Sequence, residues 1–432
     1  MAAAPWLRKL RHRLDYLSRR RRQNKSNSMS RIKDYLMDLE EGRIVPGEIQ
    51  DKSVCADHFD STYLQNYINE NGTNGKCSYC GMHHVVLPMP DFVQLVRRKI
   101  ESEFDDVDEA GLPTERSYFD DDEEKIPGLR RFYGYTAPSD AKCYEDTSEV
   151  LADIDLLPEP EALYNDLLEA LPAHPWISSD PFIISCDKEL SLQWKNFSEM
   201  VMHRQRFTFW TREEFSGSRS EYDNCLMDIL HELGSLIHEA DLCKMLEPEE
   251  LLFRARPIEK DTPLEFKEII SPPDAVASQN RMSPAGISMF YGAYDEETAR
   301  LESSYNHDGK GRFLIGQFHV KKPLLILDLT DIPKPLFWEQ GQDYREQLIF
   351  LHTFLKEISK PAAKDDKNHT EYVPTQVFTE YLRFVFKYYG KDLLDGIKYR
   401  SSINNNPCIV LFCNQRESKA MLELKKVEDT NK

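Results

Sequence analysis

Four residues with the side chains of metal ligands stand in two short pairs near the start of the chain. Cys55 and His58 form a C-x2-H pair, and Cys77 and Cys80 form a C-x2-C pair that is followed by Gly81. Each spacing lets two side chains reach one ion from a tight turn, and Cys3His is a usual tetrahedral set for structural Zn²⁺. Because protein ligands would fill all four positions, we predict a structural zinc site rather than a catalytic one.

The sequence leaves the histidine of this site open. His83 and His84 lie close enough along the chain to replace His58. Ordinary buried cysteines beside an incidental histidine are the alternative to a metal site. The nine cysteines of the chain have no regular secretory spacing, so a reducing, cytoplasmic environment is the simpler interpretation.

A second set of polar residues is concentrated between residues 252 and 304. Arg254 stands near the end of an apolar run, Arg281 precedes a Gly-containing turn, and Tyr291 ends a short predicted strand. Glu302 follows within a pattern of helical spacing. Each residue alone has an ordinary explanation, because surface Arg, core Tyr and solvated Glu are all common. Only the ordered set, among so many turn and strand signals, indicates a site.

This stretch resembles the core of the RES family, which is named for its Arg, Glu and Ser, and the resemblance covers residues 251–415. Position by position, the family's site residues fall on Arg254, Tyr291, Glu302 and Ser401. The family's Gly-Arg pair falls on Asn280 and Arg281, so Asn replaces the Gly here. The resemblance therefore supplies an ordered candidate site.

RES proteins look like distant relatives of ADP-ribosyltransferases, and the resemblance implies an α+β fold of that type. It also implies that NAD is the substrate, cleaved at the nicotinamide–ribose bond by hydrolysis or phosphorolysis in a toxin or defence effector. An antitoxin or other regulatory protein is then the expected partner. The alternatives are ADP-ribosyl transfer to a macromolecule and a non-catalytic interaction protein with a degenerate NAD fold. No Gly-rich dinucleotide fingerprint follows a strand, so a hydride-transfer enzyme is not expected.

The implied chemistry needs few groups. The transition state at C1′ is oxocarbenium-like and positive, and Glu302 would stabilise it, as carboxylates do in glycosidases. Arg254 would clamp the pyrophosphate, and Arg281 would add a further substrate contact. Tyr291 would stack on the nicotinamide or ribose, and Ser401 would hydrogen-bond the nicotinamide or a phosphate.

Close neighbours could take three of these roles. Arg256 stands beside Arg254, Ser402 follows Ser401, and Glu296 and Glu297 are the nearest alternatives to Glu302. We expect Asp295 to cap the helix that carries Glu302. That cap places Glu302 about two turns, or roughly 10 Å, along the helix axis.

Strands and a few helices must position these residues. The runs RFLIGQFHV and LLILDLT are predicted strands joined by Lys-Lys-Pro as a hairpin-like or bent pair, and GIKYRSS and CIVLF are predicted as two more. Residues 373–390 predict an amphipathic helix. Its apolar stripe comprises Val377, Tyr381, Phe384 and Tyr388. Strands interleaved with a few helices give an α+β core.

The N-terminal part resembles the HEPN/RES N-terminal domain, in which a zinc-like segment precedes a helical bundle. Residues 148–250 carry apolar residues three and four apart almost throughout, which predicts helices. The Arg-x4–6-His spacing of HEPN ribonucleases does not occur in this region, so we interpret the bundle as a scaffold or regulatory module. Five parts are expected: a basic extension and helix at 1–50, a zinc-binding segment with an acidic linker at 51–140, a helical domain at 141–250, a RES domain at 251–415 and a charged tail at 416–432.

Length and charge set further limits. A chain of 432 residues amounts to two or three domains. The net charge of −19 argues against general binding to nucleic-acid backbones, although residues 1–28 carry nine Lys or Arg. That basic segment is either a solvated extension or an amphipathic or targeting helix, with Met29 as an alternative start. No run of about 18 apolar residues occurs, so no membrane span is expected. The sequence leaves the oligomeric state open.

Overall fold

The computed structural model describes most of the chain. The described residues are 44–114, 128–207, 221–258, 269–304, 312–360, 368–390 and 392–429. The basic segment at 1–28, the helix expected after Met29 and part of the acidic linker lie outside these ranges.

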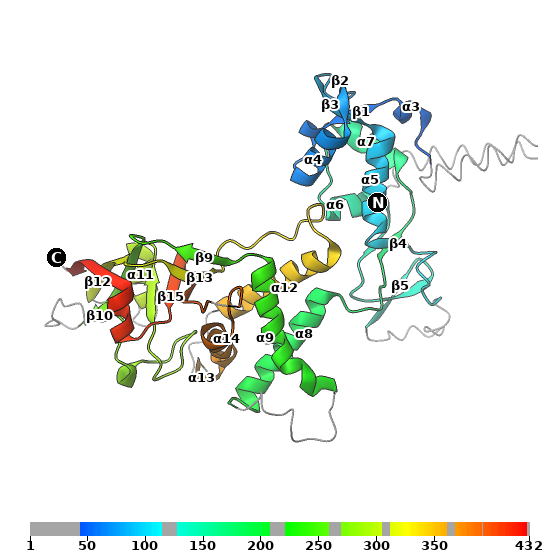
Figure 1. The fold of residues 1–432 in the computed structure, drawn as a ribbon. Helices are drawn as coiled ribbons and strands as arrows, with labels where there is room; N and C mark the ends of the chain where they lie inside the picture. The colour runs from blue at the N-terminus through cyan, green and yellow to red at the C-terminus, as the bar shows by residue number, and fades with distance from the viewer. Residues whose placement is uncertain are drawn as a thin grey trace, which may run out of the picture. The chain divides into compact units, whose positions relative to one another are not determined.

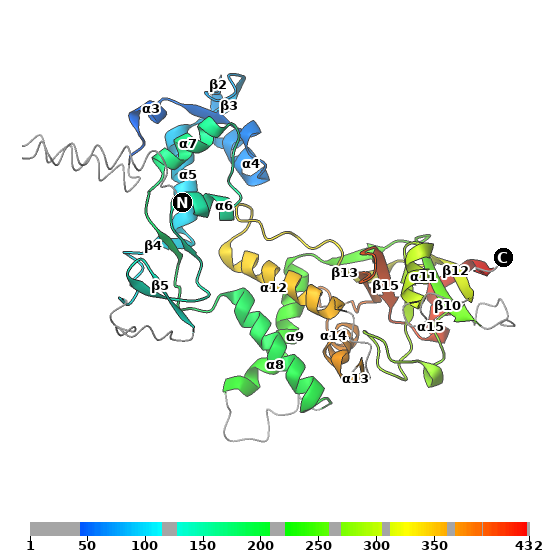
Figure 2. The same cartoon turned by 180° about the vertical axis from the view of Figure 1, so that it is seen from behind.

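The chain forms two compact units, which Figures 1 and 2 show from opposite sides. The N-terminal unit comprises residues 1–183 and 336–342, and the C-terminal unit comprises residues 184–335 and 343–432. Residues 336–342 therefore belong to the N-terminal unit, although residues of the C-terminal unit precede and follow them in the chain. Trp338 in this segment is buried in the core of the N-terminal unit and donates a hydrogen bond to the Ile154 carbonyl at 3.1 Å.

The N-terminal unit is built around helix α5 (Met89–Glu101). Its buried residues recur three and four apart, so one face is apolar and packs into the core. Helices α3 (Gly47–Gln50), α4 (Thr62–Asn71), α6 (Thr147–Asp153) and α7 (Glu161–Ala170) contribute to the same core. The small sheets of this unit are β1–β3–β2 (Ser53–Cys55, His83–Pro88, Thr73–Lys76), β4–β8–β7 (Phe104–Asp106, Trp176–Ser178, Cys143–Tyr144) and β5–β6 (Leu129–Phe132, Tyr135–Pro138).

The C-terminal unit is organised by one sheet of eight strands. The order of the strands is β16 (Leu422–Asp429), β12 (Arg312–Val320), β10 (Leu251–Ile258), β11 (Phe290–Ala293), β15 (Pro407–Leu411), β14 (Gly396–Arg400), β13 (Leu324–Asp328) and β9 (Cys243–Leu246). All neighbours are antiparallel except β13 and β14, which are parallel. The α+β class is therefore confirmed.

The expected hairpin between the strands at 312–320 and 324–328 is wrong. Strand β12 pairs with β10 and β16, whereas β13 pairs with β14 and β9 on the far side of the sheet. The apolar runs predicted that both segments are buried strands, but an apolar pattern does not specify a partner strand. The region 148–250 also contains strands β8 and β9, which are too short to show a period of their own.

Four helices share one core with the apolar face of this sheet, and Figure 1 shows them gathered at its β13 and β9 end. They are α8 (Cys186–His203), α9 (Glu221–Glu239), α12 (Gln342–Ser359) and α14 (Val373–Phe384). Helix α14 ends at Phe384, whose side chain is exposed, and Tyr388 lies beyond the helix end. The predicted stripe thus holds for Val377 and Tyr381 only. The short elements α13 (Asn368–Glu371) and η4 (Asp274–Val276) also belong to this unit.

The helical domain expected at 141–250 is divided between the two units. Helices α6 and α7 belong to the N-terminal unit, and α8 and α9 belong to the C-terminal unit. Trp194 and Phe197 of α8 and Leu233 of α9 are buried in the core that contains Ile397 and Val410 of the sheet. Helices α8 and α9 are therefore part of the body that carries the RES-like strands.

This arrangement predicts that a fragment starting at Glu247 will not fold. It lacks α8, α9 and β9, so the apolar residues that these elements cover become exposed. Losing even one large core side chain typically costs about 3–5 kcal/mol, and this fragment loses several. Circular dichroism and size-exclusion chromatography should show an unfolded or aggregated fragment, whereas a fragment of residues 184–432 should fold. A compact, monomeric Glu247 fragment would contradict the shared core.

The segment at 416–432, expected as a charged tail, contributes to the sheet. Helix α15 (Gln415–Met421) begins after Asn414, whose side chain accepts hydrogen bonds from the amides of Arg416 and Glu417 in a capping box. Strand β16 then pairs with β12 along its length. Its charged residues are explained by its place at the edge of the sheet. Among the helices that the structure describes, none has the length and apolar composition needed to cross a membrane.

Candidate functional site

The predicted site residues lie around a seam in the eight-stranded sheet. Strand β10 pairs with β12 along its whole length, from Leu251 to Ile258, but with β11 only at Phe253 and Ala293. Helix α11 (Glu296–Ser304) packs against β10, β11 and β12. Figure 2 shows it beside β10 and β12. We call this sparsely paired boundary between β10 and β11 the seam. A side chain can enter the sheet there, because few backbone hydrogen bonds close it.

Arg254 occupies the seam. Its Nη1 donates a hydrogen bond of 2.7 Å to the carbonyl oxygen of Tyr291, and its guanidinium carbon lies 5.3 Å from the centre of the Phe290 ring. Burial, with a smaller contribution from the neighbouring Arg256, lowers the pKa of Arg254 to about 10. The guanidinium is therefore still charged at neutral pH. Its Nε is buried and has no hydrogen-bond partner among the described residues, which suits a site for an anionic group.

Glu302 and Ser401 are in direct contact. Ser401, which is buried, donates a hydrogen bond from Oγ to Oε1 of Glu302 at 2.5 Å. Ser303 donates to the Ala255 carbonyl at 2.6 Å, which fixes the end of α11 on β10. Glu302 and Ser401 are 99 positions apart in the chain, so only the tertiary fold brings them together.

The start of α11 explains how this contact is held. Asp295 accepts a hydrogen bond from the Thr298 amide at 2.8 Å, so the predicted cap is confirmed. Asn404 and Asn406 donate to the Thr298 hydroxyl at 2.8 and 3.1 Å. The loop that follows Ser401 is thus tied to the first turn of α11, while Glu302 stands in its last turns.

Tyr291 is held at both ends. Its carbonyl oxygen accepts the hydrogen bond from Arg254, and its hydroxyl shares a hydrogen bond of 2.9 Å with the Ser283 hydroxyl. Burial raises the pKa of Tyr291 to about 12, so the phenol is neutral at physiological pH. The backbone and the ring are therefore both fixed beside the seam.

Arg281 is partly committed to a structural role. Its Nη1 donates to the Ile358 carbonyl at the end of α12 at 2.5 Å, and its guanidinium carbon lies 5.7 Å from the centre of the Tyr372 ring. It still acts electrostatically on Tyr291 and Tyr399. Arg281 is thus anchored on the helices of the unit.

Tyr399 belongs to this group of residues, although the sequence analysis did not select it. Burial raises the pKa of Tyr399 well above its usual value, and Cys408 and Glu302 raise it further. Register places Tyr399 opposite Cys408, and Cys408 opposite Ala293, so these three side chains share one face of the sheet. Its position in β14, two residues before Ser401, could have identified it.

A separate cluster in the N-terminal unit unites the four predicted metal ligands. The donor atoms of Cys55, His58, Cys77 and Cys80 all lie within 4.8 Å of one another. The Sγ atoms of Cys55 and Cys80 are 3.8 Å apart, and a tetrahedron with Zn–S bonds of about 2.3 Å has edges of about 3.8 Å. The four residues therefore fit a tetrahedral metal ion.

The turn between the paired cysteines has the conformation that such a site needs. The Gly81 amide donates to the Cys77 carbonyl at 3.0 Å, and Gly81 has a φ of +73°, which favours glycine. His83 is exposed, and His84 faces Asp57 at 3.4 Å, so neither belongs to the cluster. The structure thus selects His58 as the histidine.

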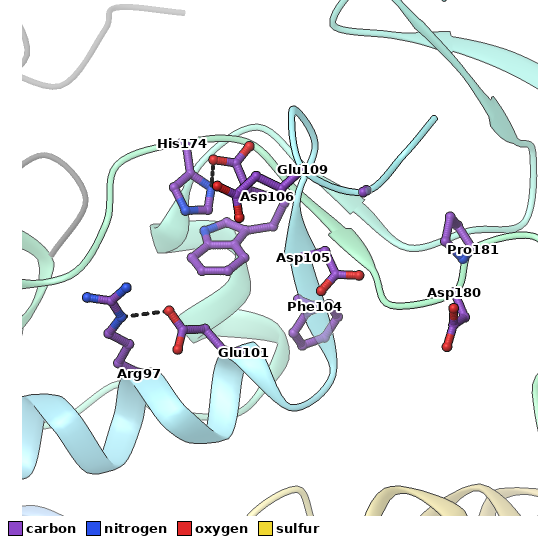
Figure 3. A pocket seen from close by; sticks show the side chains of 11 residues that line it. Arg97, Glu101, Phe104, Asp105, Asp106, Glu109, His174, Asp180 and Pro181 are labelled. Atoms are coloured by element: carbon purple, nitrogen blue, oxygen red, sulfur yellow. Dashed lines mark hydrogen bonds and ion pairs between the residues drawn. The ribbon is translucent and has the colours of Figure 1, made fainter. Parts of the chain in front are cut away.

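The N-terminal unit also contains an acidic pocket of about 540 Å³, drawn in Figure 3. Its lining includes Glu101, Asp105, Asp106, Glu109 and Asp180. Two of these carboxylates have basic neighbours, because Arg97 donates to Glu101 at 2.6 Å and His174 lies 3.7 Å from Asp106 (Figure 3). None of the predicted site residues lines this pocket.

Comparison with known families identifies two domains in the chain. Residues 70–215 match HEPN/RES N-terminal domain 1, and residues 251–429 match the RES domain. The chain is therefore a RES-domain protein with a HEPN/RES N-terminal domain. Its RES match extends to the end of β16. No curated protein and no solved structure matches the chain.

Proposed function

We propose that the RES domain cleaves the nicotinamide–ribose bond of NAD by hydrolysis or phosphorolysis, on an ADP-ribosyltransferase-like fold. The observation that carries this proposal is the hydrogen bond from Ser401 to Glu302, beside a seam that holds the charged guanidinium of Arg254. A carboxylate held by a buried hydroxyl, in a domain that also holds a buried, charged guanidinium, suits a nicotinamide riboside with a pyrophosphate.

Glu302 would act on the reacting carbon. Nicotinamide leaves as a neutral base, so the departure of the leaving group needs no general acid, and positive charge develops on the ribose ring. A fixed carboxylate stabilises that charge more than it stabilises the ground state. The bond from Ser401 to one carboxylate oxygen fixes the orientation of the other oxygen, which can then face the ribose.

Arg254 would bind the pyrophosphate. We expect Arg254→Ala to raise KM by about 10- to 100-fold, because hydrogen bonds to charged groups contribute about 1.5–3 kcal/mol. The expected change in kcat is much smaller, since the phosphates keep their charge in the transition state. Steady-state kinetics with NAD would measure both constants. Arg254→Lys keeps the charge without the planar fork, so its KM should lie between those of the wild type and Arg254→Ala. An unchanged KM in Arg254→Ala would remove this residue from the phosphate site.

The test of the proposal is to incubate purified full-length protein with NAD, with and without phosphate, and to identify the products. Free ADP-ribose indicates hydrolysis, and an ADP-ribose phosphate formed only with phosphate present indicates phosphorolysis. Label transferred to a protein or nucleic acid would indicate an ADP-ribosyltransferase instead. NAD left intact would favour a non-catalytic interaction protein.

Consumption of NAD is the property by which this protein would act as a toxin or defence effector, and an antitoxin or other regulatory protein is the partner that it would require.

We also propose that the ion of the Cys3His cluster is a structural Zn²⁺. All four donors come from the protein, which leaves no position for a substrate.

A further inference from the structure

The hydroxyl of Tyr291 is linked to the helices of its own unit through one short loop, residues 280–283. In this loop the Asn280 amide donates to the Ser283 carbonyl at 2.8 Å, and the Ser283 amide donates back to the Asn280 carbonyl at 3.3 Å. Ser283 is almost completely buried, and its hydroxyl lies 2.9 Å from that of Tyr291. The shape of the loop therefore decides where the Tyr291 hydroxyl is held.

Gln376 of helix α14 fixes the shape of this loop. Its side-chain amide is buried, and Nε2 donates to the carbonyls of Asn280 and Ser283 at 2.8 and 3.4 Å. The loop is held at a second point by Arg281, which donates to the end of α12. Two helices thus hold both sides of the loop, and without Gln376 the buried Ser283 carbonyl would keep only the Asn280 amide as a donor.

We infer that Ser283 and Gln376 are positioning residues for Tyr291, so that helix α14 sets the geometry of the NAD site. This inference rests on the proposed function. It gives α12 and α14 a role in substrate binding. Neither the apolar faces of these helices nor the predicted site residues indicate that role. Gln376 acts through the loop, the loop acts through the Ser283 hydroxyl, and that hydroxyl holds the ring of Tyr291.

A double-mutant cycle tests this chain of contacts. We expect Ser283→Ala and Tyr291→Phe each to raise the KM for NAD about three- to tenfold, as the loss of one buried hydrogen bond does, with a smaller change in kcat. The double variant should be no worse than Tyr291→Phe alone, because both changes remove the same contact. Gln376→Met, which keeps the length of the side chain but removes its donor, should raise KM in the same range.

Thr379→Val is the matched control. Thr379 is buried on the same helix, and its hydroxyl donates within the helix, to the Thr375 carbonyl at 2.8 Å. This variant should lower the melting temperature without changing KM. A KM shift in Thr379→Val equal to that of Gln376→Met, or multiplicative effects of Ser283→Ala and Tyr291→Phe, would overturn the inference.

The same cycle measured on the free energy of unfolding separates this inference from the proposed function. Coupling between Ser283 and Tyr291 in unfolding needs no substrate. Wild-type protein that leaves NAD intact refutes the proposed function. Wild-type protein that consumes NAD, with independent effects of the two substitutions, refutes the positioning role alone.

Discussion

Glu302→Gln should lower kcat for NAD cleavage by about 10²–10³, since preorganised charge stabilisation of this type contributes roughly 3–4 kcal/mol. Gln keeps the volume of the side chain and can still accept the hydrogen bond from Ser401, so the variant removes the negative charge and little else. KM should change much less, because in our proposal Arg254 and Tyr291 hold the ground-state substrate. Steady-state kinetics at saturating NAD measures the effect.

Glu296→Gln and Glu297→Gln are suitable controls. Both residues are exposed in the first turn of the helix that carries Glu302, and both are its nearest alternatives in sequence. Neither substitution should change kcat appreciably. Wild-type turnover in Glu302→Gln would show that this carboxylate is not at the reacting carbon, and a large loss in either control would move the catalytic role to that residue.

Cys77→Ser should remove the metal ion and unfold the part of the N-terminal unit that surrounds it. Binding of structural Zn²⁺ contributes about 10–16 kcal/mol in small zinc domains, which is comparable to the whole stability of a typical protein. Elemental analysis should find about one zinc per wild-type chain. Thermal unfolding should show a lower melting temperature together with the loss of metal.

Cys143→Ser is the matched control, because Cys143 lies in the same unit but outside the cluster. It should keep its metal. Wild-type protein that is fully folded without metal would rule out the zinc site. Loss of NAD cleavage in Cys77→Ser through unfolding would leave the structural interpretation of the ion unchanged.

Local patterns allowed part of this site to be predicted from the sequence. Two pairs of ligands at short spacing predicted the metal cluster, because each pair is set by one turn. Asp295 was predicted as a helix cap for the same reason. The strands were predicted by their apolar runs, but the partners of β12 and β13 were not, since burial does not specify pairing.

The remaining features depend on the tertiary fold. Ser401 was selected only through a family resemblance, and nothing in the sequence between Glu302 and Ser401 predicts that they touch. Tyr399 and Gln376 were missed because their neighbours come from distant segments. Ser283 was missed although Tyr291 is only eight residues away, because no local pattern sets the direction of its hydroxyl. The packing of α8 and α9 on the sheet was missed because an apolar helix face predicts burial but does not specify the surface against which the helix packs.

The position of strand β16 at the edge of the sheet determines whether the domain can be truncated at its C-terminal end without aggregating. It covers the outer edge of β12, a strand whose side chains are buried along most of its length. A chain cut before Leu422 would leave the outer edge of β12 unpaired, as a template on which other chains can add and aggregate. The charged side chains of β16 make it a poor template in turn, so we expect these few residues to protect the domain against self-association into fibres.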